Sequence, residues 1–161
     1  MTMNSWEIFY DTLFVITAVL FNLLVVGIYL AQAHEQEKLV RAFGGGLVFL
    51  ILPLDLVFVG YLLNGRSLEV LAALVVVFVY LMTELLLDLI LKFDFRSKTI
   101  WHIAYIVLFY AATFSLIGIA FTISDSAGYF VSVTFWAVLG ALIYLMRRKY
   151  KQNNGSLLEQ H

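Results

Sequence analysis

Long apolar stretches alternate with short polar ones along the whole of this sequence. A helix needs about 20 consecutive apolar residues to cross a hydrocarbon layer that is about 30 Å thick. Stretches of this length occur at approximately residues 8–31, 42–63, 68–91, 100–123 and 128–146. The pattern therefore predicts an all-α, polytopic integral membrane protein, in which residues 1–161 form a single bundle of five transmembrane helices that ends in a short basic tail, 147–161.

Lysine and arginine residues predict how these spans are oriented, because loops on the cytoplasmic side retain them. Arg66 lies in a segment between the second and third spans, on one side of the membrane. The other nine basic residues all fall in segments on the opposite side, namely Lys38, Arg41, Lys92, Arg96, Lys98, Arg147, Arg148, Lys149 and Lys151. We therefore expect the N-terminus outside and the C-terminus in the cytoplasm, in a plasma (inner) membrane.

Composition supports a membrane location and excludes several classes of function. Hydrophobic residues make up 63% and charged residues 13% of the chain, whereas soluble domains are about half apolar and a quarter charged. The net charge of −1 provides no basic surface, so no nucleic-acid partner is expected. The absence of cysteine excludes disulfides, thiolate metal sites and iron–sulfur clusters. No nucleophile-elbow, P-loop or dinucleotide motif is present, and no enzymatic activity is predicted.

A few ionisable side chains fall inside the predicted spans, where a charge at the centre costs about 2.5 to 3.5 kcal/mol unless it is paired, hydrated or neutralised. They are Asp11, Asp55, Glu84, Asp88 and His102. Asp11 lies within one turn of the outer surface, so we expect its carboxylate to reach water. The other four are the candidates for a functional site.

Asp55 lies near the middle of the second span, two residues after Pro53, the only proline. A proline removes one backbone hydrogen bond and bends the helix, which frees a carbonyl at a depth that water does not reach. A carboxylate beside such a bend favours an ion or proton site. The alternative, in which Asp55 only forms a hydrogen bond with a neighbouring helix, has equal weight.

Glu84 and Asp88 are four residues apart, so both carboxylates lie on one side of the third helix. A simple hairpin after this helix sets Asp88 level with His102. This register predicts a carboxylate–imidazole pair near the cytoplasmic surface. A hydrogen bond that only ties two helices together is the alternative, and it has slightly more weight.

The preceding hairpin, with its turn near Gly65, sets Glu84 opposite a run of three glycines that ends at Gly46. It also sets Glu84 about 12 Å further from the outer surface than Asp55, so the two carboxylates could act only as successive stations joined by water. Small-residue packing is the preferred explanation of the glycines. Asn22 of the first span is singled out as a neutral polar group that contributes to the path or joins helices.

Cofactor and lipid contacts have weaker signals. The three histidines, of which His102 is one, are too dispersed for a zinc site, and no cofactor is predicted. His102 could still serve as an axial ligand to haem or chlorophyll. The candidates for contacts with anionic lipid headgroups are Arg147, Arg148, Lys149 and Lys151.

These residues predict first a small proton- or cation-translocating membrane protein, alone or as the translocating subunit of a complex. Asp55 would bind the ion, Glu84 would relay it, and Asp88 with His102 would form a gate. The alternative is a non-catalytic structural or assembly subunit of a larger membrane complex. A third class is a haem-, pigment- or lipid-binding protein that uses His102. Besides the bilayer, the expected partners are further copies of the chain or other membrane subunits, because five helices enclose little interior.

Overall fold

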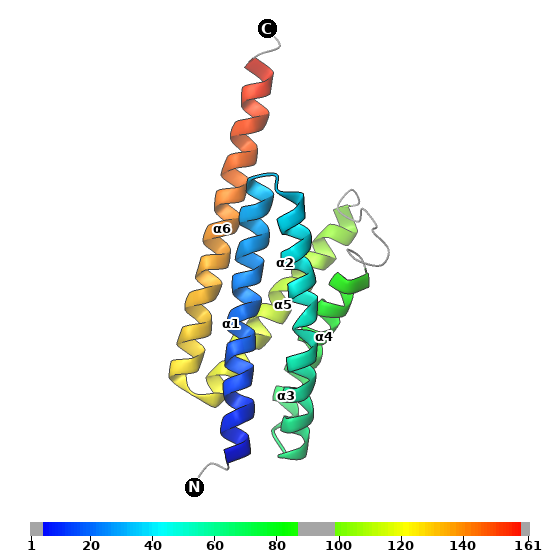
Figure 1. Cartoon of the computed structure of the whole chain (residues 1–161), viewed down its shortest axis with the longest axis vertical. Helices are drawn as coiled ribbons and strands as arrows, with labels where there is room; N and C mark the ends of the chain where they lie inside the picture. Colours follow the sequence, from blue (N-terminus) through cyan, green and yellow to red (C-terminus); the bar gives the residue numbers. More distant parts are fainter. Residues whose placement is uncertain (1–4, 87–98, 159–161) are drawn as a thin grey trace.

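The computed structural model describes residues 5–86 and 99–158, with side chains over residues 5–86 and 103–152. All regular structure in these residues is helical. The elements are α1 (Ser5–Ala33), α2 (Glu37–Phe49), α3 (Ile51–Leu63), α4 (Leu68–Glu84), α5 (Thr99–Ile123) and α6 (Asp125–Leu158), shown in Figure 1. The described part of the chain therefore has the all-α fold class that the apolar stretches predict.

Helices α2 and α3 are two parts of one long rod that breaks at Leu50. Pro53 has no N–H to donate to the carbonyl of Phe49, four residues earlier, and its ring crowds that carbonyl. Helix α2 therefore ends at Phe49, and the N–H of Leu50 donates to the carbonyl of Leu47 at 3.2 Å. Because α3 follows at once, the two helices run along nearly one line (Figure 1).

The helices form a closed ring in which α2 and α3 count as one rod. Helix α1 contacts both α2 and α3, α3 contacts α4, α4 contacts α5, α5 contacts α6, and α6 returns to α1. Helices α1 and α6 run parallel, whereas α5 crosses obliquely behind the α2–α3 rod and α1 to reach the lower end of α6 (Figure 1). We call the end where the chain begins the lower end, and the end where α6 projects beyond the other helices the upper end.

The interior of the ring is one apolar cluster to which every rod contributes. Its most deeply buried side chains include Phe14, Phe21, Leu74, Leu116 and Val131, none of which is more than 1% exposed. The outward faces also carry large apolar side chains along every rod. Helices that are apolar on all sides are typical of proteins surrounded by lipid.

Two glycines allow neighbouring helices to approach closely near the lower end. A Cβ atom added to Gly60 of α3 would lie 2.5 Å from the ring of Tyr10 in α1. A Cβ atom added to Gly128 of α6 would overlap the ring of Phe121 in α5. The spacing of these helix pairs therefore depends on the missing side chain.

The predicted spans agree with the helices except in detail. Four of the predicted spans lie within described helices: 8–31 in α1, 42–63 in the α2–α3 rod apart from the break at Leu50, 100–123 in α5 and 128–146 in α6. Helix α4 covers residues 68–84 of the third predicted span. Residues 87–91 of that span lie outside the described residues. Among the described helices, four are long and apolar enough to cross a membrane, namely Ser5–Ala33, Glu37–Leu63, Ile103–Ile123 and Asp125–Gln152.

Two boundaries of the last helix differ from the prediction. The turn expected over residues 124–127 is reduced to Ser124, whose Oγ accepts the N–H of Ala127 at 3.1 Å and so caps α6. At the other end, the basic segment that begins at Arg147 continues α6 as a helix as far as Leu158.

Candidate functional site

The structure separates Asp55 from Glu84. Asp55 lies on the outward side of α3, whereas Glu84 is only 8% exposed at the upper end of α4. Counted along the helices from the α3–α4 turn, their depths differ by about 12 Å. Asp88 and the side chain of His102 lie outside the described residues. The predicted Asp88–His102 pair is therefore not part of the sites described below.

Glu84 belongs to a buried cluster with two tyrosines. The hydroxyl of Tyr80, one turn earlier in α4, donates to Glu84 Oε1 at 2.7 Å. The hydroxyl of Tyr105 in α5 donates to the same oxygen and lies 3.2 Å from the hydroxyl of Tyr80. The rings of Phe21 and Phe109 pack against Tyr80 at centroid distances of 5.7 and 5.6 Å. The cluster thus joins α4 to α5 within an aromatic surround.

The glycine run does not form part of this cluster. A Cβ atom added to Gly46 would meet only Leu24 of α1, at 3.4 Å, and Cβ atoms added to Gly44 or Gly45 would have no neighbour within 4 Å. A Cβ atom at any of these glycines thus has no atom of Glu84 within 4 Å. The physical reason is that the α2–α3 rod lies against α1 over this length and makes only limited contact with α4.

Asp55 is part of an exposed, otherwise apolar side of α3. Leu52, Val59 and Leu62 on this side are 58%, 49% and 56% exposed. Asp55 itself is exposed and forms no hydrogen bond or ion pair with any of the described residues. The carboxylate therefore points away from the ring at a depth of about two helical turns above the end of α3.

A third carboxylate, Asp11, forms a polar cluster that the sequence did not reveal. Arg66 Nη2 donates to both Asp11 oxygens, at 2.7 and 2.6 Å, and Tyr61 Oη donates to Oδ1 at 2.8 Å. The guanidinium carbon of Arg66 also lies 5.1 Å from the centre of the Tyr61 ring. The side chain of Asp11 is 5% exposed and that of Arg66 26% exposed. The expectation that Asp11 reaches water is thus wrong, because the α3–α4 turn folds Arg66 over it.

Asn22 connects α1 to α6. Its Nδ2 donates to Thr134 Oγ1 at 2.8 Å and approaches the carbonyl of Val131 at 3.3 Å. Asn22 is fully buried, and its Oδ1 has no hydrogen-bond donor among the described residues. Asn22 thus joins two helices through its Nδ2 group.

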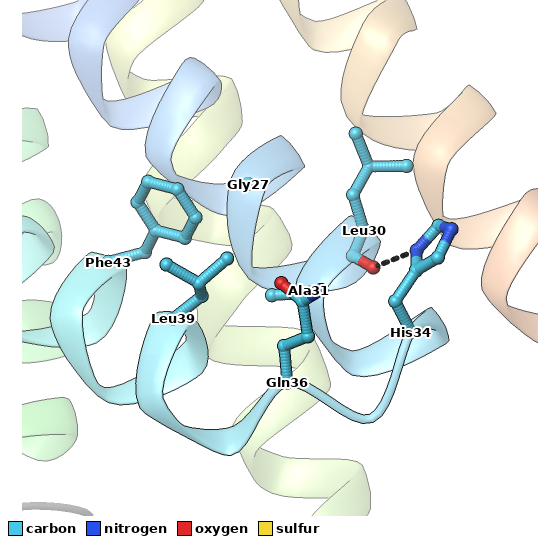
Figure 2. Close-up of a pocket in the computed structure, with 7 residues that line it drawn as sticks. All are labelled: Gly27, Leu30, Ala31, His34, Gln36, Leu39 and Phe43. Carbon is cyan, nitrogen blue, oxygen red and sulfur yellow. Dashed lines mark hydrogen bonds between the residues drawn. The ribbon is translucent and has the colours of Figure 1, made fainter.

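A shallow pocket of about 370 Å³ lies between α1 and α2 at the upper end. Figure 2 shows its lining residues, Gly27, Leu30, Ala31, His34, Gln36, Leu39 and Phe43. His34 Nδ1 lies 2.9 Å from the carbonyl of Leu30, so this nitrogen must carry the proton, and the ring stacks on Tyr144 of α6. Within the described residues there is no group of three or more metal-binding side chains at this pocket or elsewhere. The pocket is apolar apart from its rim.

The predicted headgroup residues lie on the projecting part of α6. Arg147, Lys149 and Lys151 are exposed and Arg148 is half-buried. Gln152 Nε2 donates to Glu35 Oε1 at 2.8 Å, which fixes this part of α6 against the α1–α2 turn. The basic side chains are therefore held on a helix at a defined distance from the upper end of the bundle.

No family model matches this chain, and neither a curated protein nor a solved structure is similar enough to match it. The class of protein thus follows from the fold alone. The described chain is all-helical, with four helices long and apolar enough to cross a membrane and with exposed apolar faces, and these features are consistent with a helical membrane protein.

Proposed function

We propose that this chain is a non-catalytic subunit of a membrane assembly and that it binds its partner through the exposed side of α3. It would be inserted in the plasma (inner) membrane with its N-terminus outside and its C-terminus in the cytoplasm. The observation that carries the proposal is the position of Asp55. Among the described carboxylates that lie away from the ends of the rods, it is the one that the bundle leaves exposed and unpaired, whereas the exposed Glu69 and Asp125 lie in the first turns of α4 and α6.

The depth of Asp55 favours an external partner. Asp55 lies eight residues from the end of α3, which corresponds to about 12 Å inside the span. An aspartate side chain is too short to reach the interface from there, and the cost of a charge near the centre is about 2.5 to 3.5 kcal/mol on insertion scales. A polar group on a neighbouring helix removes this cost. Membrane helices that associate commonly use such polar contacts.

The other polar side chains act within the bundle. Asp11 bonds to Arg66, and Glu84 and Asn22 each join two helices. At the depth of Asp55 the interior between α3 and α4 is filled by Leu54, Val57, Leu74 and Val77, each at most 1% exposed. Aliphatic packing of this kind favours a structural role for the bundle and leaves the α3 side as its contact surface.

The proposal is tested by purification of the tagged chain from its own membrane in a mild detergent. We expect a complex of defined stoichiometry. Asp55→Leu should release the partner, whereas Val133→Leu on the exposed side of α6 should not. Isolation of a monomer with native Asp55 would overturn the proposal.

Proton or cation translocation is a second candidate, favoured by one specific feature. Glu84 and the hydroxyls of Tyr80 and Tyr105 form a contiguous chain of groups that exchange protons. In this function Asp55 binds the ion at the contact with the partner, Glu84 relays it, and Asp88 with His102 forms the gate.

The test of translocation is ion flux into proteoliposomes that contain the whole assembly. Asp55→Asn and Glu84→Gln should each abolish flux while the protein still folds. Wild-type flux in both variants would exclude this function. An absorption spectrum of the same sample tests haem or pigment at His102.

The basic residues of α6 belong to the proposal as membrane contacts. Arg147, Arg148, Lys149 and Lys151 would each gain about 1 kcal/mol from an anionic membrane surface. Their removal should weaken the preference for anionic lipid without loss of the partner.

A further inference from the structure

We infer that the pocket between α1 and α2 holds an acyl chain of one anionic phospholipid, and that Arg148 and Lys151 of α6 bind the phosphate of this lipid. The inference rests on the membrane contact proposed for the basic residues of α6, and it names the ligand of that contact. It concerns a different surface of the bundle from the exposed side of α3.

The pocket is apolar along its length and polar only at its upper edge. Its volume of about 370 Å³ falls in the range of about 300 to 1,000 Å³ that is typical of small-molecule sites. The apolar lining comes from both helices, namely from Gly27, Leu30, Ala31, Leu39 and Phe43 (Figure 2). The polar lining residues, His34 and Gln36, belong to the α1–α2 turn above them. This order of polarity is that of a lipid, with its chain below and its headgroup above.

The depth of the pocket also matches a lipid chain. Gly27 and His34 are seven residues apart, so the pocket extends along α1 for about 10 Å. The ring of His34 stacks on Tyr144, which sets the upper edge of the pocket level with the end of the apolar part of α6. The basic segment of α6 starts only three residues later, at Arg147. A chain in the pocket would therefore place its headgroup beside the basic segment.

Arg148 and Lys151 lie on the side of α6 that borders the pocket. They follow Tyr144 by four and seven residues, so they share its side of the helix. Their Cα atoms lie about 6 and 10 Å further along α6 than that of Tyr144. Side chains of a helix lean toward its N-terminus, which for α6 is the direction of the bundle (Figure 1). Both basic side chains can therefore reach the level of the upper edge of the pocket.

The charge at this end of the bundle favours an anionic headgroup. Residues 147–158 include four basic and no acidic residues. Of the nearby carboxylates, Glu35 accepts a hydrogen bond from Gln152, and Glu37 forms an ion pair with Arg41 at 3.7 Å. The four basic side chains of α6 form no ion pair with any described residue. A lipid phosphate supplies a counter-charge for them, and the attached chain fills the apolar pocket.

Native mass spectrometry of the full chain, purified in a neutral detergent, tests the inference. The apparent Kd of the first bound lipid is measured for dioleoyl phosphatidylglycerol and for dioleoyl phosphatidylcholine, and the anionic lipid should bind more tightly. Arg148→Gln and Lys151→Gln should each weaken binding of phosphatidylglycerol about 3- to 10-fold. Lys149→Gln is the matched control, because Lys149 lies about 140° around the helix from Tyr144. It should weaken binding less than about 2-fold.

A second pair of variants tests the pocket separately from the charges. Leu39 lines the pocket and is 43% exposed, so Leu39→Trp can fill the pocket without disturbing the buried core. It should weaken binding of both lipids about 10-fold, because several methylene groups lose their contact with the pocket. Leu56→Trp is the control, since Leu56 is 48% exposed on α3, away from the pocket. Glycerol phosphate, which has no acyl chain, should bind at least about 100-fold more weakly than phosphatidylglycerol.

The possible failures separate the inference from the proposed membrane contact. Equal weakening by Arg148→Gln, Lys151→Gln and Lys149→Gln would reflect general attraction to anionic lipid and would overturn the inference alone. Unchanged lipid binding in Leu39→Trp, or tight binding of glycerol phosphate, would overturn the placement of a chain in the pocket. A bound protein that Leu39→Trp releases in place of lipid would do the same. Equal affinity of the native chain for both lipids would overturn the inference and the proposed membrane contact together.

Discussion

Replacement of Arg66 by methionine removes the guanidinium that covers Asp11 while it keeps most of the aliphatic stem. Asp11 would then remain as a carboxylate that is 5% exposed at its side chain, with Tyr61 as its one described donor. Loss of one partner from a buried ion pair costs about 3 to 5 kcal/mol. Because 26% of the Arg66 side chain is exposed, water screens part of the interaction, and we expect a loss of about 2 to 3 kcal/mol in the free energy of unfolding.

The complementary substitution, Asp11→Asn, should cost less. The amide still accepts a hydrogen bond from Tyr61, and the partly exposed guanidinium of Arg66 still lies against the Tyr61 ring and reaches water. We expect a loss of about 1 kcal/mol. In the double variant the buried carboxylate is gone, so Asp11→Asn should partly rescue Arg66→Met. The rescue is expected because the Asp11 side chain is more deeply buried than that of Arg66, so an unpaired Asp11 costs more than an unpaired Arg66.

Reversible unfolding in mixed micelles, followed by circular dichroism, measures these differences as a double-mutant cycle. Arg41→Met is the control, because its 3.7 Å ion pair with Glu37 joins side chains that are 81% and 86% exposed. It should change stability by less than about 0.5 kcal/mol. The loss in the double variant is compared with the sum of the losses in Asp11→Asn and Arg66→Met. If the two agree to within about 0.5 kcal/mol, this pair is not a buried connection between α1 and the α3–α4 turn.

Three further variants test the packing and the internal polar contacts. Gly128→Ala should destabilise the bundle by about 1 to 3 kcal/mol, because the added Cβ overlaps the ring of Phe121; an unchanged thermal midpoint would contradict this close approach. Asn22→Leu removes both the buried carbonyl group that has no described donor and the two hydrogen bonds that Nδ2 donates to α6, so the effects should offset each other to within about 1 kcal/mol; a loss above about 2 kcal/mol would show that the α1–α6 hydrogen bonds outweigh the buried carbonyl group. Tyr105→Phe removes one hydroxyl from Glu84 and should cost about 1 to 2 kcal/mol in the same unfolding assay, whereas no loss would show that the α4–α5 connection is not needed.

The helices were predictable because the signal for a membrane span is length and apolarity, both of which are local in sequence. The break near Pro53 was also predictable, since a proline changes the backbone bonds of its own helix. The contact between Asp11 and Arg66 was not, because these residues are 55 positions apart and meet only when α1 packs beside α3. Asp11 and Arg66 both lie near an expected membrane surface, where contact with water accounts for each charge without a partner.

The outward position of Asp55 was also hidden from the sequence, for a different reason. Helix α3 is apolar on all sides, so its hydrophobic pattern does not distinguish the side that faces the ring from the side that faces lipid. Only the positions of α1 and α4 decide it. The same helix buries Leu54 and Val57 against its neighbours and exposes Asp55 between them. An ion or proton site around Asp55 was therefore an expectation that the sequence could state but not test.

Asp11, Asp55 and Glu84 differ in the part of the structure that provides their hydrogen-bond donors. This difference relates the fold to the proposed assembly. Asp11 and Glu84 receive donors from the ring itself, because ring closure brings Arg66 and Tyr105 to them. None of the described helices covers the outward side of α3, so the proposal assigns the polar partner of Asp55 to another chain. The same side chain that makes a single bundle unfavourable in lipid, by about 2.5 to 3.5 kcal/mol, therefore favours the pair when a partner covers it. A leucine at this position would lower the first cost and remove the second gain, so the proposal expects the substitution to change association and not folding.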